Sequence, residues 1–246
     1  MALVTTEAFV VQAIRYGETS MIYRLFTRDR GVVPVIAKGV RRPKSRFGAR
    51  MDPFHRLDVT YYDKPSREIQ TLSRADLVSD YPGVIGSLER MEAAGAWFRF
   101  LRRVVPEHAP AEPLFTLAAA ALRRLEAVEI RAIPRWSTYH RLAAVRTLGL
   151  APMVDACAGC GAALPDSEGM GFSVEEGGAV CSRCAGGAAG RLGRDEYGLL
   201  VVFDHPDWSL VDALGSGARG EARVRERLDR FVAWHADARP AGAGSA

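Results

Sequence analysis

The chain has 246 residues and a mass of 26.8 kDa, with 48% hydrophobic and 25% charged residues. This composition is typical of a folded globular protein and excludes a chain that is mostly disordered. The longest apolar run lies near Leu114–Leu122 and is shorter than the roughly 20 residues needed to cross a bilayer. The N-terminus also lacks the basic and then apolar pattern of a secretion signal. We therefore expect a soluble, cytoplasmic protein with no membrane contact.

The positive charge is concentrated at the start of the chain. Residues 1–60 hold eleven Lys/Arg and five Asp/Glu, whereas the remaining residues hold 22 and 24. The sequence pI is about 9.0. A basic segment of this kind favours a polyanionic partner, most often nucleic acid.

The first 80 residues show the pattern of a small β-domain. Short runs of β-branched and aromatic residues are separated by Gly17, Gly31, Gly39 and Pro65. The predicted strands are Phe9–Ile14, Met21–Phe26, Val32–Ile36, Leu57–Tyr62 and Ile69–Leu72. Five short strands in this length predict a barrel, for which the OB-fold is the common nucleic-acid-binding example. We assign residues 1–80 to it.

Helical periodicity begins after Asp76. A stripe from Leu88 to Val105 predicts a first helix, Leu114–Val128 a second, and a third begins at Pro134 and stops at Gly149. The segment Leu199–Phe203 fits a strand or a helix, and a last amphipathic helix covers about Gly220–Ala236. The fold class is therefore α+β. The predicted helical domain comprises residues 81–150 and 191–238, and the tail 239–246 is expected to be disordered.

Four cysteines interrupt the helical domain within residues 151–190. They form two pairs, Cys157–Cys160 and Cys181–Cys184, each with two residues between the sulfurs. This spacing predicts a structural Zn²⁺ ion in a closed shell of four thiolates. Disulfides are disfavoured in a reducing cytosol, and a redox pair is disfavoured outside a βαβ unit. The segment is rich in glycine and poor in large apolar residues, so it needs such an ion to order it. We expect an inserted zinc-ribbon-like module.

A second candidate site is the basic stretch, which we define as residues Lys38–Arg50. It contains six cations and no acid: Lys38, Arg41, Arg42, Lys44, Arg46 and Arg50. Gly39, Pro43 and Gly48 favour a loop between the third and fourth strands. Such a loop presents groups that bind phosphates, and Arg can do so with two hydrogen bonds. Phe47 either stacks on a base or packs the loop against the barrel, and the sequence favours neither alternative.

The N-terminal residues resemble those of the RecO family of recombination mediators. The resemblance rests on Tyr16–Ser20 (YGETS), Leu25–Arg28 (LFTR), Gly31 and Ala37–Phe47 (AKGVRRPKSRF), within about residues 5–75. The order of barrel, helices, inserted cysteine module and further helices fits the family over the rest of the chain. Only a subset of the family carries the four cysteines.

The resemblance implies a DNA repair protein of homologous recombination rather than an enzyme. Such a protein binds single- and double-stranded DNA and anneals complementary strands. With RecR it helps RecA to replace the single-strand-binding protein, whose tail it binds through the helical domain. It also implies that Lys38, Arg41, Arg42, Lys44 and Arg46 contact DNA.

The sequence leaves three other functions open. An OB-fold with a basic loop suits a zinc-containing RNA-binding or ribosome-associated protein equally well. A nuclease or glycosylase with an unrecognised site is a second alternative. A scaffold whose basic surface meets an acidic protein tail is a third.

Overall fold

The computed structural model divides the chain into two compact units, with the division between Ala127 and Val128. The structure describes residues 2–43, 45, 47, 51–105, 109–164, 169–186, 190–214 and 220–237. The predicted disordered tail, residues 239–246, lies outside this range.

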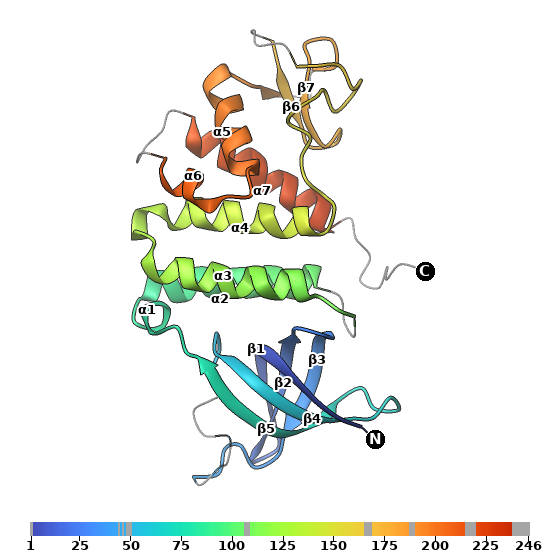
Figure 1. Cartoon of the computed structure of the whole chain (residues 1–246), viewed down its shortest axis with the longest axis vertical. Coiled ribbons are helices and arrows are strands. Elements are labelled where there is room, and N and C mark those ends of the chain that lie inside the picture. Colours follow the sequence, from blue (N-terminus) through green and yellow to red (C-terminus); the bar gives the residue numbers. More distant parts are fainter. Residues whose placement is uncertain are drawn as a thin grey trace. The chain divides into compact units, whose positions relative to one another are not determined.

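The first unit begins with five strands that close into a barrel (Figure 1). They are β1 (Ala2–Tyr16), β2 (Ser20–Thr27), β3 (Gly31–Ala37), β4 (Arg56–Asp63) and β5 (Gln70–Ser79). The strand order is β1-β2-β3-β5-β4, and β4 pairs back with β1. All pairs are antiparallel except β3 with β5. The strand number and closure agree with the predicted OB-fold.

All five barrel strands are longer than predicted, β1 and β5 by six residues or more. The core inside the barrel contains apolar side chains from every strand, including Val10, Leu25, Val35, Val59 and Leu72. Strand β1 starts seven residues before the predicted Phe9 and pairs with β4 at one end and β2 at the other. The register shifts between Val10 and Gln12, as at a β-bulge, where a strand bends. Such a bend allows β1 to pair with both neighbours.

Three helices complete the first unit: α1 (Pro82–Ile85), α2 (Leu88–Val104) and α3 (Glu112–Ala127). The hydroxyl of Ser87 caps α2 by accepting from the amide of Arg90. Phe9 on β1 contacts Phe98 of α2 and Phe115 of α3, with ring centroids 5.4 and 5.0 Å apart. An aromatic core therefore joins the outside of the barrel to these helices.

The second unit is helical with a small sheet. Its elements are a 3₁₀ turn (Ile130–Ala132), α4 (Ile133–Thr147), β6 (Gly171–Ser173), β7 (Gly178–Val180), β8 (Gly190–Arg191), α5 (Arg194–Asp204), α6 (Trp208–Asp212) and α7 (Glu221–Asp237). Helix α4 begins and ends close to the predicted Pro134 and Gly149. The ambiguous segment Leu199–Phe203 is helical and lies in α5, with Leu200 and Phe203 buried.

A buried ion pair ties the helices of the second unit together. The Arg135 guanidinium on α4 donates to both carboxylate oxygens of Glu221, at 3.0 and 2.6 Å. It also donates to the carbonyl of Leu214, at 2.6 Å. This one side chain therefore fixes the start of α7 and the end of the α6 segment to α4. No helix among the described residues is both long and apolar enough to span a bilayer.

Candidate metal centre and nucleic-acid interface

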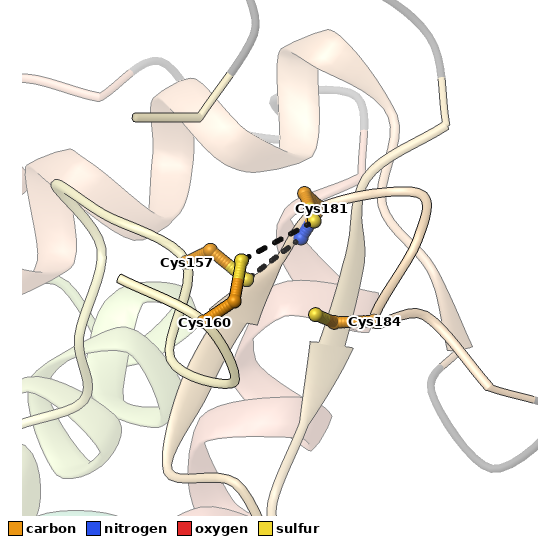
Figure 2. A group of neighbouring side chains, drawn as sticks. All are labelled: Cys157, Cys160, Cys181 and Cys184. Atoms are coloured by element: carbon orange, nitrogen blue, oxygen red, sulfur yellow. Dashed lines mark hydrogen bonds between the residues drawn. The ribbon is translucent and has the colours of Figure 1, made fainter. Parts of the chain in front are cut away.

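The structure brings the four cysteines together at one end of the small sheet β7-β6-β8. Cys157 and Cys160 lie in the turn before β6, and Cys181 and Cys184 lie in the turn after β7. Their sulfur atoms all lie within 4.8 Å of one another. Figure 2 shows the four side chains converging on one point. No disulfide joins them.

The distance between the sulfurs of Cys160 and Cys181 fits a tetrahedral metal ion. The sulfurs of Cys160 and Cys181 are 3.9 Å apart. A tetrahedral zinc ion with four bonds of about 2.3 Å requires sulfurs about 3.8 Å apart. The cluster could therefore hold a metal ion with little rearrangement.

Main-chain groups support the cluster. The amide of Cys181 donates to the sulfur of Cys157, at 3.2 Å. The two cysteine turns close on themselves, since the amide of Gly161 donates to the carbonyl of Cys157 and that of Ala185 to the carbonyl of Cys181. Such amide donors stabilise negative charge on the sulfur.

The two glycines of the first turn have different roles. Gly161 has a φ of +71°, which a side chain would strain. Gly159 instead lies against the second turn, because a Cβ at this position would be 3.2 Å from the Cβ of Cys184. Gly161 therefore supplies backbone freedom to this turn, and Gly159 allows the two turns to approach.

Hydrogen bonds within the cluster shift the pKa values of Cys157 and Cys184 in opposite directions. The amide of Cys181, and secondarily those of Cys160 and Gly159, lowers the pKa of Cys157 to about 6. Hydrogen bonds with the sulfurs of Cys160, Cys181 and Cys157 raise the pKa of Cys184 to about 12. Four thiolates at this spacing repel one another, and a bound cation offsets that repulsion.

The module is attached to the helices of its own unit. The Tyr197 hydroxyl on α5 donates to the carbonyl of Val154, at 2.7 Å. Arg227 on α7 donates to the carbonyl of Arg191, at 2.6 Å. The apolar cluster inside the module is small, since its buried members are Cys157, Val180 and Cys181. The module therefore has helical supports but little core of its own.

The basic stretch follows β3 at the surface of the barrel. Lys38, Arg41 and Arg42 are exposed, whereas Lys44, Arg46 and Arg50 lie outside the described residues. The amide of Arg41 donates to the carbonyl of Thr19, and its guanidinium donates to the carbonyl of Glu18, both at 3.0 Å. These contacts hold the start of the stretch against the turn between β1 and β2.

Apolar residues within the same stretch and directly after it anchor it to the barrel core. Phe47 and Met51 are buried at 1% and 4% exposure and belong to the barrel core, and Val40 packs partly against it. For Phe47 the structure shows the packing arrangement, so stacking on a base would require this ring to leave the core. Sequence reasoning missed the anchoring by Val40 and Met51, although both are apolar residues among charges.

Three other cations of the first 60 residues, Arg28, Arg30 and Arg56, pair with carboxylates of the same unit. Arg56 donates to both carboxylate oxygens of Glu7, at 2.7 and 2.8 Å, and Arg30 pairs with Asp63 at 3.2 Å. Arg41, in contrast, contacts main-chain carbonyls. These groups have no net charge, so they do not neutralise its exposed guanidinium. The exposed aromatic Tyr16, at 55% exposure, lies beside this start of the stretch and was not among the predicted site residues.

The structure defines a class of protein that combines a five-stranded barrel and a helical unit. The barrel carries a basic stretch, and the helical unit carries a cluster of four cysteines. The N-terminal family model of recombination protein O matches residues 1–81, and the C-terminal model matches residues 86–242. The chain therefore belongs to the RecO family of DNA repair proteins.

Individual relatives support this assignment over the length of the chain. A DNA repair protein RecO from Anaeromyxobacter sp. (strain K) is 33% identical over 229 residues, covering 92% of this chain and 89% of that protein. The one from Rubrobacter xylanophilus is 34% identical over 253 residues, covering 100% and 95%. The one from Thermobifida fusca is 31% identical over 242 residues, covering 96% and 94%.

Proposed function

We propose that this RecO family member binds single- and double-stranded DNA through the basic stretch and anneals complementary strands. We further propose that it acts with RecR to help RecA replace single-strand-binding protein on DNA in the cytoplasm. In this role the protein is a mediator and breaks no covalent bond. The observation that carries the proposal is the anchoring of the basic stretch, which presents Lys38, Arg41 and Arg42 at the barrel surface.

The physical basis is the neutralisation of phosphate charge. Two DNA strands repel each other, and a cationic surface that holds both lowers this repulsion. Guanidinium groups bind phosphate oxygens through two hydrogen bonds, which holds the backbone without reading the sequence of the bases. Since the proposed contacts are with phosphates, we expect little sequence preference.

We also propose that the four cysteines bind one structural Zn²⁺ ion. Four thiolates at tetrahedral spacing are a typical zinc shell and leave no open position for a reacting molecule. Cys157, Cys160, Cys181 and Cys184 would hold the ion, which supplies the folding energy of the module. Its proposed role is to order residues 151–190 for their attachment to α5 and α7.

DNA binding is tested by removing three cations of the basic stretch together: Arg41→Ala, Arg42→Ala and Lys44→Ala. If all six cations contact phosphates of single-stranded DNA, the slope of log affinity against log salt is about −4 for the unaltered protein and about −2 for the variant. A matched control removes the exposed helical residues Arg123, Arg131 and Arg230, which lowers the net charge equally. An unchanged slope in the first variant would refute the proposed interface.

RNA competition separates this proposal from its nearest alternative. Single-stranded RNA of the same sequence should compete no better than DNA for the unaltered protein. A clear preference for RNA would instead support an RNA-binding protein built on the same barrel and basic stretch.

A further inference from the structure

The outer face of strands β1, β2 and β3 carries an apolar and aromatic platform. Ile14 pairs with Ile22, and Ile22 pairs with Ile36, so the three side chains form a row across the strands. Tyr16 pairs with Ser20 in the next row on the same face. Met21, the neighbour of Ser20, pairs with Ala37, the last residue of β3, and Lys38 follows Ala37 in the turn.

This face is directed away from the barrel core. The alternate residues Tyr23, Val35 and Ala37 point inward and are buried in the core. Ile14 and Tyr16 are 43% and 55% exposed. Gly17, with a φ of +64°, starts the turn to β2, so Tyr16 is the last residue of its strand and its ring stands at the edge of the platform.

Positive charge lies at both ends of the platform. At the edge with Tyr16, Arg41 is tied to the carbonyls of Glu18 and Thr19. At the other end, Arg102 of α2 donates to the side-chain oxygen of Gln12 on β1, at 2.8 Å. Arg102 and the neighbouring Arg103 are both exposed. A polyanionic strand crossing the platform would therefore meet cations before and after it.

We infer that Tyr16 stacks on an unpaired base of single-stranded DNA whose phosphates contact Lys38, Arg41 and Arg42. Stacking on an exposed aromatic ring is independent of base identity, and it requires a base that is not enclosed in a duplex. Stacking by Tyr16 therefore favours single strands over duplexes, whereas the cations serve both forms of DNA. This inference rests on the proposed function, because it places the base contact beside the proposed phosphate contacts.

A second exposed tyrosine of the barrel serves as the control. Tyr62 on β4 is 39% exposed and pairs with Leu3 near the beginning of β1. From Leu3 to Tyr16, β1 covers about 40 Å of extended strand. Tyr62 thus shares the chemistry and exposure of Tyr16 without its place beside the basic stretch.

The test compares three DNA ligands of equal length: a thymine-rich single strand, the same backbone without bases, and a duplex. Tyr16→Ala should weaken binding to the single strand about fivefold or more. Its affinities for the strand without bases and for the duplex should change less than about twofold. Tyr16→Phe, which keeps the ring, should bind as the unaltered protein does, and so should Tyr62→Ala.

The outcomes separate this inference from the proposed function. Equal losses on all three ligands, no loss on any, or failure of Tyr16→Phe to restore binding would overturn the stacking role. In each of these cases the loss of binding by the Arg41, Arg42 and Lys44 variant still tests the basic stretch. If the unaltered protein binds none of the ligands at moderate salt, the proposed function fails and the role of Tyr16 fails with it.

Discussion

The barrel and the cysteine module obtain their order in different ways. Among the residues that the structure describes, fourteen buried ones form the barrel core, contributed by all five strands and by Phe47 and Met51. The buried cluster of the cysteine module has three residues, of which two are cysteines. The barrel is therefore stabilised by apolar burial, whereas the order of the module is proposed to depend on a metal ion held by its cysteines.

This difference determines where the residues of the two sites can be changed. In the barrel the exposed cations Arg41 and Arg42 lie outside the core, so the proposed DNA-binding surface and the fold are separable. In the module two of the four proposed ligands, Cys157 and Cys181, also belong to the buried cluster, so the proposed site and the fold are not separable. Substitutions of the exposed cations should therefore weaken DNA binding with little loss of stability, whereas substitutions of the cysteines should unfold the module.

Removal of the metal should produce the largest effect and should leave the barrel intact. Structural zinc sites contribute about 10 kcal/mol or more of binding free energy. A strong chelator, or Cys160→Ser with Cys184→Ser, should therefore remove the hydrogen-exchange protection of amides such as those of Cys157 and Ala185. Protection of strands β1–β5 should persist.

The control for this experiment is Ser182→Ala, which alters the second turn without removing a ligand. Elemental analysis should find one zinc per chain in this control and in the unaltered protein. A double cysteine variant that retains protection of both turns would show that the module does not need a metal.

Phe47→Ala should destabilise the barrel by about 3 kcal/mol or more, because the ring is buried at 1% exposure. Phe47→Leu should recover most of the loss, since it keeps an apolar side chain of similar reach. Denaturant unfolding gives both values. A Phe47→Ala protein of normal stability that has lost affinity for single-stranded DNA would support base stacking and contradict the packing in this structure.

Glu221→Ala should cost the second unit about 3 kcal/mol. The change leaves the Arg135 guanidinium buried without its carboxylate, and the side chains of this pair are only 7% and 11% exposed. The exposed pair Arg230–Glu226 is the matched control, and Glu226→Ala should cost less than about 1 kcal/mol. Equal unfolding free energies for the two variants would contradict the role of the buried pair.

The smallest effect on stability is expected in the basic stretch. Arg41→Ala with Arg42→Ala should change the free energy of unfolding by less than about 1 kcal/mol, because both side chains are exposed. Replacing Arg41 removes the hydrogen bond from its guanidinium to the carbonyl of Glu18, which lies at the protein surface. Denaturant unfolding measures the change. A large loss of stability would mean that these cations support the barrel fold, against the proposed separation of fold and function.

Local patterns predicted most of the architecture because they follow the period of each element. Short runs of β-branched and aromatic residues between turn residues identified all five strands, and helical stripes placed α2, α3, α4 and α7 within a few residues of their ends. Strand β1 was predicted too short, since Thr5, Thr6 and Glu7 weaken the apolar alternation at its start. The type of α5 remained open because Leu199–Phe203 is a short apolar run, which has no diagnostic period.

The site residues were likewise predictable only where the sequence signal is local. The cysteine spacing predicts a cluster because two short turns determine the geometry of each pair. Phe47 could not be assigned, because its burial depends on how a loop folds back onto a closed barrel. The place of Tyr16 beside Lys38 depends on the pairing of three strands, which sequence alone does not provide.

The most direct test of the account is annealing of two complementary oligonucleotides, followed by fluorescence quenching across a salt series without ATP. The unaltered protein should accelerate annealing at low salt and lose this effect as salt rises, because the proposed contacts are with phosphates. The Arg41, Arg42 and Lys44 variant should anneal slowly at all salt concentrations, whereas the Arg123, Arg131 and Arg230 control should behave as the unaltered protein does. Annealing of the unaltered protein that is absent, or that is unchanged in the basic-stretch variant, would contradict the central claim.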